Sequence, residues 1–324
     1  MSDKLPFEIQ IEIMKKLPGY LGLRYVSIFD DDNFPKNMVD LSAILPDSAK
    51  QSTTLSLVGS SQGLLCLYDY FRAIIWNPWI RKSVTVTFPN FDYRNYGRVV
   101  GFGVCPRTSD PKLVQITFPR YSLGNNTWKV EVFSLSLGFW RISSFNKISD
   151  LPCGSFELSS PSECVGGFIY WCASNKDDPN RSWVIISFDL TNEEFGVIYL
   201  PDSLARCRLV DLSKHRESLV LFPYDYNIAF YDCDVWMMEG GVTKSFKKLF
   251  TINSTNDFVK PLAISYNGEA VLEIVESFRK KIVSSIDTYE PSSKRFKCTT
   301  ITGESGCTSI SSYTETMLLR DYYD

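Results

Sequence analysis

Histidine is almost absent from this sequence of 324 residues. The only one, His215, stands between Lys214 and Arg216 in a polar segment. A single imidazole excludes multi-histidine metal sites and leaves one candidate histidine base, so we expect His215 to lie in a surface loop. The sequence also lacks G-x-S-x-G, H-E-x-x-H and a phosphate-cradling glycine loop. These absences remove the motifs of several enzyme classes.

Carboxylates are the remaining candidates for catalysis. Asp92, Asp225, Asp232 and Asp234 lie in or near predicted loops, where a pair could serve glycoside hydrolysis. Solvated loop acids are the commoner case, and we therefore predict a protein without a catalytic site. The acidic run at 30–32 lacks the glycine and the terminal glutamate of a calcium-binding loop, which indicates a solvated turn and no metal site.

Paired cysteine motifs are missing as well, although the chain has nine cysteines. Most lie in apolar, strand-like runs, and no two form a C-x-x-C pair. An odd number with this placement predicts buried free thiols in a reducing compartment. The positions are Cys66, Cys105, Cys153, Cys164, Cys172, Cys207, Cys233, Cys298 and Cys307.

No apolar run approaches the ~20 residues of a membrane-spanning helix, and the N-terminus lacks the apolar core of a signal peptide. We expect a soluble protein of the cytoplasm, the nucleus or both. The net charge of −3 gives no bulk attraction to nucleic acid or to an anionic membrane. Basic clusters at Lys244, Lys247 and Lys248 and at 279–281 stand beside predicted turns, where we expect them to keep sheet edges soluble.

The sequence is rich in patterns typical of β-strands. Within residues 58–89, an apolar strand at 64–67 leads through a polar turn to a second at 73–76, which ends at Asn77-Pro78 and is followed by an alternating strand from 83 to 88. Asn-Pro is a turn signal because proline fixes its own φ and cannot donate to a central ladder. The segment predicts one antiparallel meander.

The same pattern recurs along the chain at intervals of about 50 residues, counted from Gly63, Leu113, Gly167, Glu217 and Gly268. This period is typical of kelch-like propeller blades and exceeds that of WD40 repeats. We predict an all-β fold, a kelch-like β-propeller of six blades over residues 24–320. The strand predicted at 313–320 would pair with strands of residues 24–44 to close the ring and cover both edges.

Residues 1–18 differ from the rest. Apolar side chains at 5, 9, 13 and 17 follow an i, i+4 spacing, with Pro6 suited to a first helical turn and Pro18 to a stop. The segment predicts a short N-terminal helix, either packed on its own domain or used for docking.

Two resemblances bear on function. The first rests on seven blocks in order, which are SQGLLCL at 61–67, WNPWIRK at 76–82, GFG at 101–103, VEVFSL at 130–135, GFIYW at 167–171, ISFDL at 186–190 and VWM at 235–237. Through these blocks, residues 24–320 resemble the F-box-associated domain of plant F-box proteins, the group that includes the S-locus F-box proteins of self-incompatibility. The resemblance implies the part of an SCF (cullin–RING) ubiquitin ligase that recruits a protein substrate.

Residues 5–18 resemble the first part of an F-box, whose remainder is replaced here by Gly19-Tyr20-Leu21-Gly22. This truncated motif implies contact with a Skp-type adaptor and, through it, with cullin. The residues that fall on the motif, and which would bind the adaptor, are Leu5, Pro6, Ile9, Ile13, Met14, Leu17 and Pro18.

A propeller places its loops on two rims, which suits a protein partner. Three predicted loops have the tyrosine, arginine and asparagine composition of interface anchors, although such loops can equally pack on themselves. Their candidate contact residues are Tyr68, Tyr70, Arg72, Tyr93, Arg94, Tyr96, Tyr224 and Tyr226.

We therefore predict a non-catalytic substrate-recognition subunit of a ubiquitin ligase, without cofactor, that recruits an unknown protein target. Two alternatives stay open. The first is a propeller interaction protein without adaptor binding, acting as a decoy or scaffold. The second is a propeller glycosidase.

Overall fold

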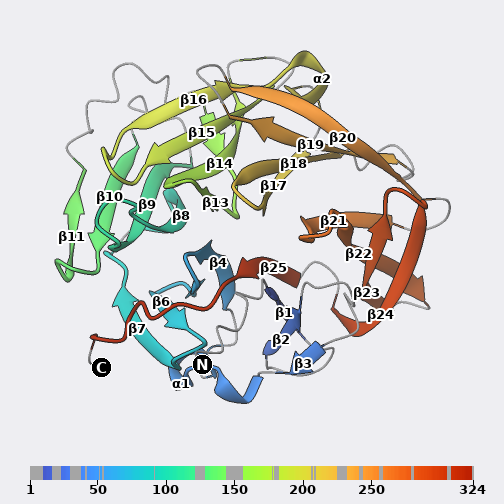
Figure 1. Cartoon of the computed structure of the whole chain (residues 1–324). Coiled ribbons are helices and arrows are strands. Elements are labelled where there is room, and N and C mark those ends of the chain that lie inside the picture. The colour runs from blue at the N-terminus through green and yellow to red at the C-terminus, as the bar shows by residue number, and fades with distance from the viewer. Residues whose placement is uncertain are drawn as a thin grey trace, which may run out of the picture.

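A computed structural model describes residues 10–16, 23–29, 38–40, 42–50, 52, 55–90, 92–120, 128–143, 156–176, 178, 182–205, 207, 209–224, 232–240, 244–254, 258–278, 281–304 and 308–322. Within these ranges the strands form six antiparallel sheets, which Figure 1 shows arranged around a common axis. The β-propeller class predicted from the repeat is confirmed. In the part of the chain that the structure describes, helix is confined to three short segments, η1 (Ser42–Ile44), α1 (Asp47–Lys50) and α2 (Asp202–Ala205).

Five of the sheets are built from consecutive strands. The first has β4 (Ser56–Ser61), β5 (Leu64–Tyr68), β6 (Arg72–Asn77) and β7 (Lys82–Thr87), and the second has β8 (Tyr96–Val104), β9 (Pro111–Pro119), β10 (Lys129–Ser134) and β11 (Phe139–Ile142). The third has β12 (Phe156–Leu158), β13 (Glu163–Val165), β14 (Phe168–Asn175), β15 (Trp183–Asp189) and β16 (Phe195–Tyr199). The fourth has β17 (Leu209–His215), β18 (Ser218–Tyr224), β19 (Asp232–Glu239) and β20 (Ser245–Asn253). The fifth has β21 (Phe258–Ile264), β22 (Ala270–Phe278), β23 (Lys281–Glu290) and β24 (Arg295–Glu304).

The sequence repeat marks a turn rather than the start of each sheet. Gly63, Gly167 and Gly268 all have positive φ, between 76° and 84°, and they stand just before β5, β14 and β22, which pair with β4, β13 and β21. The innermost strands β4, β13 and β21 precede these turns (Figure 1). Two observations require glycine at position 63. Its φ is positive, and a Cβ there would lie 2.1 Å from the Thr314 carbonyl oxygen.

The sixth sheet joins both ends of the described chain. It has the order β25 (Thr308–Tyr313), β1 (Gln10–Lys16), β2 (Leu23–Phe29) and β3 (Met38–Asp40). Closure of the ring by a late strand paired with early ones is thus as predicted in outline, but the pairing strand is 308–313 and its direct partner is 10–16. The predicted strand at 313–320 is wrong, because residues 314–322 leave the sheet and pack on β4–β7.

The predicted N-terminal helix is wrong over residues 10–16. Ile13 pairs with Val26 of β2 on one side and with Ile310 of β25 on the other. The physical reason is that two strand edges were available to this segment, and pairing satisfies its backbone donors and acceptors on both sides. Leu5, Pro6, Ile9, Leu17 and Pro18 lie outside the described residues, as does the acidic run at 30–32.

The core consists of aromatic and branched side chains between neighbouring sheets. Trp171 of β14 is fully buried and packs on β8, where a Cβ on Gly101 would lie 2.4 Å from its ring. The GFG block at 101–103 therefore brings two sheets into close contact. Cys66, Cys105, Cys164, Cys172 and Cys233 are buried free thiols, as predicted, whereas Cys298 is exposed and Cys207 half-buried. Among the helices of the described ranges, none has the length and apolar character needed to cross a membrane.

Candidate functional site

Two of the three predicted partner loops lie on the same rim. The segment after β5 and the segment after β7 follow the second and fourth strands of one sheet, and alternate turns of an antiparallel meander lie at the same end. Tyr224 ends β18, which is also the second strand of its sheet, so it stands at the corresponding end of another sheet. Tyr226 and Asp225 lie outside the described residues.

An aspartate fixes the first loop. Asp69 Oδ1 accepts hydrogen bonds from the backbone N–H of Phe71 (2.9 Å) and of Arg72 (3.0 Å), and Asp69 Oδ2 pairs with Arg72 Nε at 3.2 Å. Burial would raise the pKa of Asp69, but these donors outweigh it and hold the pKa below its usual value. Arg72 also donates to the Ser48 carbonyl at 3.0 Å. The loop thus presents Tyr70 and Phe71, which are 41% and 71% exposed.

The second loop is built in the same way. Asp92 Oδ1 accepts from the Arg94 N–H at 3.0 Å, and Asp92 Oδ2 accepts from Asn95 Nδ2 at 2.6 Å. The Arg94 N–H bond is the main cause that lowers the pKa of Asp92. Tyr93 is 53% exposed. An aspartate that hydrogen-bonds the chain two residues on forms a local turn, so both loops are held in shape without a partner.

The side chains of the two loops meet. The rings of Tyr70 and Tyr93 lie 5.6 Å apart at 84°, an edge-to-face arrangement. Arg98 of β8 lies beside them, 5.6 Å from the Tyr70 ring and 4.3 Å from the Phe88 ring, and its Nη2 donates to the Tyr70 carbonyl at 2.8 Å. We call the set Tyr70, Phe71, Tyr93, Arg94, Tyr96 and Arg98 the aromatic–arginine patch.

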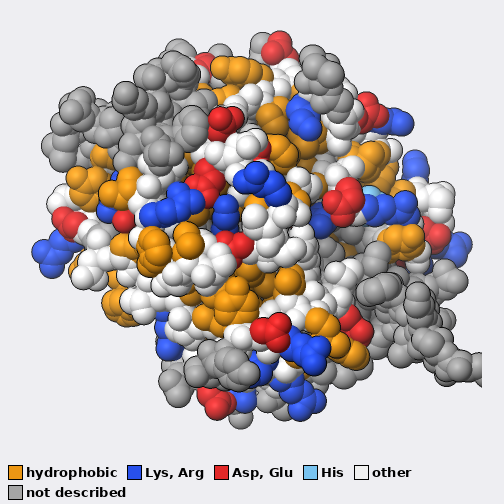
Figure 2. Space-filling model, turned by 60° about the vertical axis from the view of Figure 1, so that its left-hand side comes forward, with side chains coloured by type: hydrophobic (Ala, Val, Ile, Leu, Met, Phe, Trp, Pro, Cys, Tyr) orange, Lys and Arg blue, Asp and Glu red, His pale blue; other side chains and the backbone are white. Residues whose placement is uncertain are grey.

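Arginine also fixes the edge of this patch. Arg120 Nε donates to the Tyr96 carbonyl at 2.9 Å, and the Arg120 N–H donates to the Asn95 carbonyl at 2.8 Å. The two loops and their edge thus carry four arginines, at 72, 94, 98 and 120, and two aspartates, at 69 and 92. The local charge is positive although the whole chain carries −3. Elsewhere charges of both signs are mixed, as Figure 2 shows for one face.

Other predicted contact residues take structural positions. Tyr68 is half-buried in β5, where burial raises the pKa of its hydroxyl, and it lines a cavity rather than the open rim. Arg72 is engaged with Asp69 and Ser48. Arg98 is not among the predicted contact residues, because its place in an apolar strand gives no sign of an interface.

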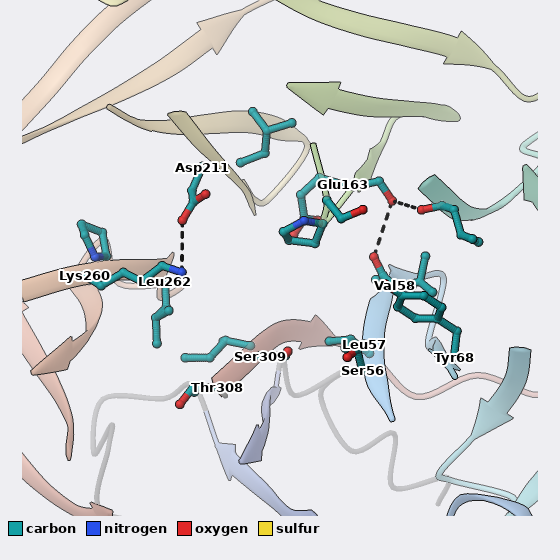
Figure 3. Close-up of a pocket in the computed structure, with 18 residues that line it drawn as sticks. Ser56, Leu57, Val58, Tyr68, Glu163, Asp211, Lys260, Leu262, Thr308 and Ser309 are labelled. Atoms are coloured by element: carbon teal, nitrogen blue, oxygen red, sulfur yellow. Dashed lines mark hydrogen bonds and ion pairs between the residues drawn. The ribbon is translucent and has the colours of Figure 1, made fainter. Parts of the chain in front are cut away.

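A cavity of about 340 Å³ lies on the propeller axis. All six sheets line it, through β4, β8, β13, β17, β21 and β25 and their flanking residues (Figure 3). Asp211 and Lys260 face each other in its wall, with Lys260 Nζ 3.4 Å from Asp211 Oδ2. A second cavity of about 110 Å³ continues from it, and Glu163 and Ile310 line both.

The residues considered for catalysis do not gather in one place. Asp234 pairs with Lys248 at 2.7 Å and Asp232 accepts from Asn253 at 2.7 Å, both between β19 and β20, while Asp92 lies in the loop after β7. His215 ends a strand and is half-buried, which corrects the expected surface loop, and burial lowers its pKa. Within the described ranges, no group of three or more histidine, cysteine or acidic residues could hold a metal ion.

The chain is similar to F-box proteins of a plant. F-box/kelch-repeat protein At3g23880 of Arabidopsis thaliana is 28% identical over 270 residues, which cover 81% of this chain and 68% of that protein. F-box protein At3g07870 of the same plant is 25% identical over 292 residues, covering 77% and 66%. The chain thus spans about two thirds of these relatives' lengths.

Among solved structures, an oligogalacturonate lyase in complex with manganese aligns over 89% of this chain and 78% of its own, with a TM-score of 0.48 and 8% identity. At this level the likeness carries no argument about activity. The family described as the F-box associated beta propeller domain matches residues 23–318. This match covers most of the chain, which therefore belongs to the F-box associated beta propeller domain family of plant F-box proteins.

Proposed function

We propose that this chain is the target-binding part of an SCF ubiquitin ligase and that the aromatic–arginine patch captures the protein to be ubiquitinated. The observation that carries the proposal is the pair of preformed loops that present Tyr70, Phe71 and Tyr93 on one rim. Tyrosine and arginine supply much of the binding energy of protein interfaces, and rigid loops lose little entropy on binding. The proposal gives the chain no catalytic step of its own.

The composition of the patch indicates the kind of target. Exposed rings beside Arg94 and Arg98 suit a segment that alternates acidic and apolar side chains, because a carboxylate can pair with guanidinium groups while an apolar neighbour packs on the rings. We therefore propose an acidic segment of a protein target as the occupant.

A test compares the wild type with the Tyr70→Ala, Tyr93→Ala double variant and with Tyr199→Ala. Tyr199 is 72% exposed on β16, so its loss is a matched control outside the patch. We expect the double variant to lose specific proteins that the other two chains capture from plant extract. The purified proteins should bind directly, bind less tightly in high salt, and be ubiquitinated when the chain is joined to the ligase. Equal capture by all three chains would refute the patch as the target site.

A second function has a specific observation in its favour. Residues 10–16 pair on both sides as β1, between β2 and β25, so their backbone does not form the helix that an F-box offers to its adaptor. This favours the alternative of an interaction protein that, as the chain stands, binds targets without the Skp-type adaptor.

Calorimetry with a purified Skp-type adaptor separates the two. We expect no binding at micromolar concentration by the chain as it stands, and binding once a complete F-box is fused before residue 10. Tight binding by the unfused chain would show that the adaptor contacts another surface, and would leave the target-binding role of the patch untouched.

A further inference from the structure

Glu163 is a carboxylate without a protein partner at the centre of the molecule. It begins β13, lines both axial cavities, and within the described part of the chain its carboxylate makes neither a hydrogen bond nor an ion pair. The positive charge of Lys214 on β17 lowers the pKa of Glu163, but the ion pair of Lys214 is with Glu217, whose Oε1 lies 3.9 Å from the Lys214 Nζ. The side chain is half-buried, and a carboxylate that loses water without gaining a partner is costly to keep charged, so such a group on a cavity is a candidate binding site.

The other charges of the cavity are already engaged. Lys260 pairs with Asp211 across neighbouring strands, as Figure 3 shows. Apart from the charged side chains of β17 and β21, the wall of the larger cavity beside Glu163 consists mainly of hydroxyl and aliphatic groups. Ser162 donates to the carbonyls of Val58 (3.5 Å) and Val100 (3.3 Å), and Leu212 and Ile310 add apolar surface.

We propose that the axial cavity binds a small organic cation, with its alkylammonium group paired to the Glu163 carboxylate and its methylenes against the apolar wall. The volume of about 340 Å³ falls within the range of ligand pockets, at the small end. An ammonium donates three hydrogen bonds, which the carboxylate and the serine and threonine oxygens of the wall can accept. The same group could come from a free amine or from a lysine side chain.

Binding of a cation should displace a proton. Burial raises the pKa of Glu163 to about 8, with Lys214 opposing the shift, so the carboxyl is mostly protonated at neutral pH. The charged and titratable groups around it come from several elements. They are Asp211, Lys214 and His215 of β17, Arg216 and Glu217 of the turn that follows, Lys260 of β21, Tyr266, Tyr68 of β5, Tyr170 of β14, and Cys164 in β13 itself. Burial raises the pKa of Tyr170 and of Cys164 and lowers that of His215, which keeps all three neutral at pH 7.

The test is calorimetry on the whole chain with putrescine and ethanolamine as free amines, an N-acetyl-lysine amide as the side-chain form, and butanediol as the neutral counterpart. We expect amines to bind and butanediol not to bind. The heat should depend on the buffer, because about one proton leaves Glu163 near neutral pH, and this release should decrease as the pH rises through about 8. Tighter binding of putrescine identifies a free amine, and tighter binding of the lysine amide identifies a protein side chain.

Glu163→Gln keeps the shape and removes the charge, so amine affinity should fall at least tenfold. Glu239→Gln makes the same charge change on an exposed residue at the end of β19 and should bind as the wild type does. Melting curves establish that each variant is folded, and Glu163→Asp provides a second variant that should bind with intermediate affinity. The proposal is overturned if no amine binds at millimolar concentration, if butanediol binds equally well, or if Glu163→Gln binds amines unchanged.

Discussion

Asn77 hydrogen-bonds the C-terminal segment of the described chain to the first sheet, and its replacement should lower the stability of the protein. The residue ends β6 and is fully buried. Its Nδ2 donates to the carbonyls of Thr316 (2.9 Å) and Leu318 (2.7 Å), and its Oδ1 accepts from the backbone N–H of Trp79 (3.0 Å) and Ile80 (3.4 Å). One amide therefore closes the turn after β6 and holds residues 316–318.

Asn77→Ala removes all four hydrogen bonds. At a net value of about 1 kcal/mol for each bond, the free energy of unfolding should fall by about 4 kcal/mol. An unfolding entropy of ~2 cal/mol/K per residue turns this into a decrease in melting temperature of about 6 °C for a chain of 324 residues. Asn77→Asp keeps the acceptor but sets a carboxylate against two carbonyl oxygens, so it should destabilise at least as much.

Differential scanning calorimetry measures the melting temperature, and trypsin cleavage after Arg320, which is exposed, measures release of the C-terminal segment. The matched control is Asn192→Ala, an exposed turn asparagine whose Nδ2 donates to Asp189, with an expected effect below about 0.5 kcal/mol. If Asn77→Ala melts within a degree of the wild type and is cleaved no faster, the four hydrogen bonds of Asn77 do not stabilise the fold or hold the C-terminal segment.

Three further predictions concern Gly101, Glu193 and Glu163. Gly101→Ala should destabilise by about 2 kcal/mol because its Cβ meets the Trp171 ring, whereas Gly240→Ala, with open space around it, should be neutral in urea denaturation. Glu193→Gln should cost about 3 kcal/mol at pH 7, since Glu193 pairs with Lys112 at 2.9 Å and with Arg141. Burial would raise the pKa of Glu193, but these two cations hold it below 4.5. The stability advantage of the wild type over Glu193→Gln is therefore complete above pH 4.5 and should vanish as the pH falls through the lowered pKa. An advantage that persisted in acid would count against the ion pairs. For Glu163 the pH dependence of stability has the opposite sign, because its raised pKa means that the folded chain holds a proton that the unfolded chain releases. The stability of the wild type relative to Glu163→Gln should therefore fall as the pH rises from about 4.5 to about 8. Melting curves of both chains across that range measure this.

The sequence predicted the strands that face neighbouring sheets and missed most of those that face the axis. β5, β9, β14, β18 and β22 are apolar runs buried on both sides, which periodicity detects. The inner strands β4 and β13 carry serine, glycine and glutamate instead, because their side chains line the axial cavity. A strand that borders a polar cavity gives no apolar alternation, so the repeat was counted from the turn that follows it.

The sequence predicted only part of the candidate site, because the contacts that form it join segments that are separate in the chain. Composition identified Tyr70 and Tyr93, but contact between them depends on how the turns after β5 and β7 lie, which no local pattern encodes. Arg98 and Glu163 stand in or beside apolar strands, and only the assembled ring shows that one reaches the rim and the other the axis.

The N-terminal segment shows how a local pattern can fit two structures. Its apolar residues at 9, 13 and 17 fit one face of a helix, while Ile11 and Ile13 within Gln10–Lys16 fit the alternation of a strand. A helix would satisfy most of its backbone groups internally but leave the facing edges of β2 and β25 unpaired, whereas a strand satisfies its own groups and covers both edges at once. The choice is therefore made by partners nearly 300 residues apart in the chain, Ile13 and Ile310, and any surface that binds an adaptor through residues 10–16 would have to break this pairing first.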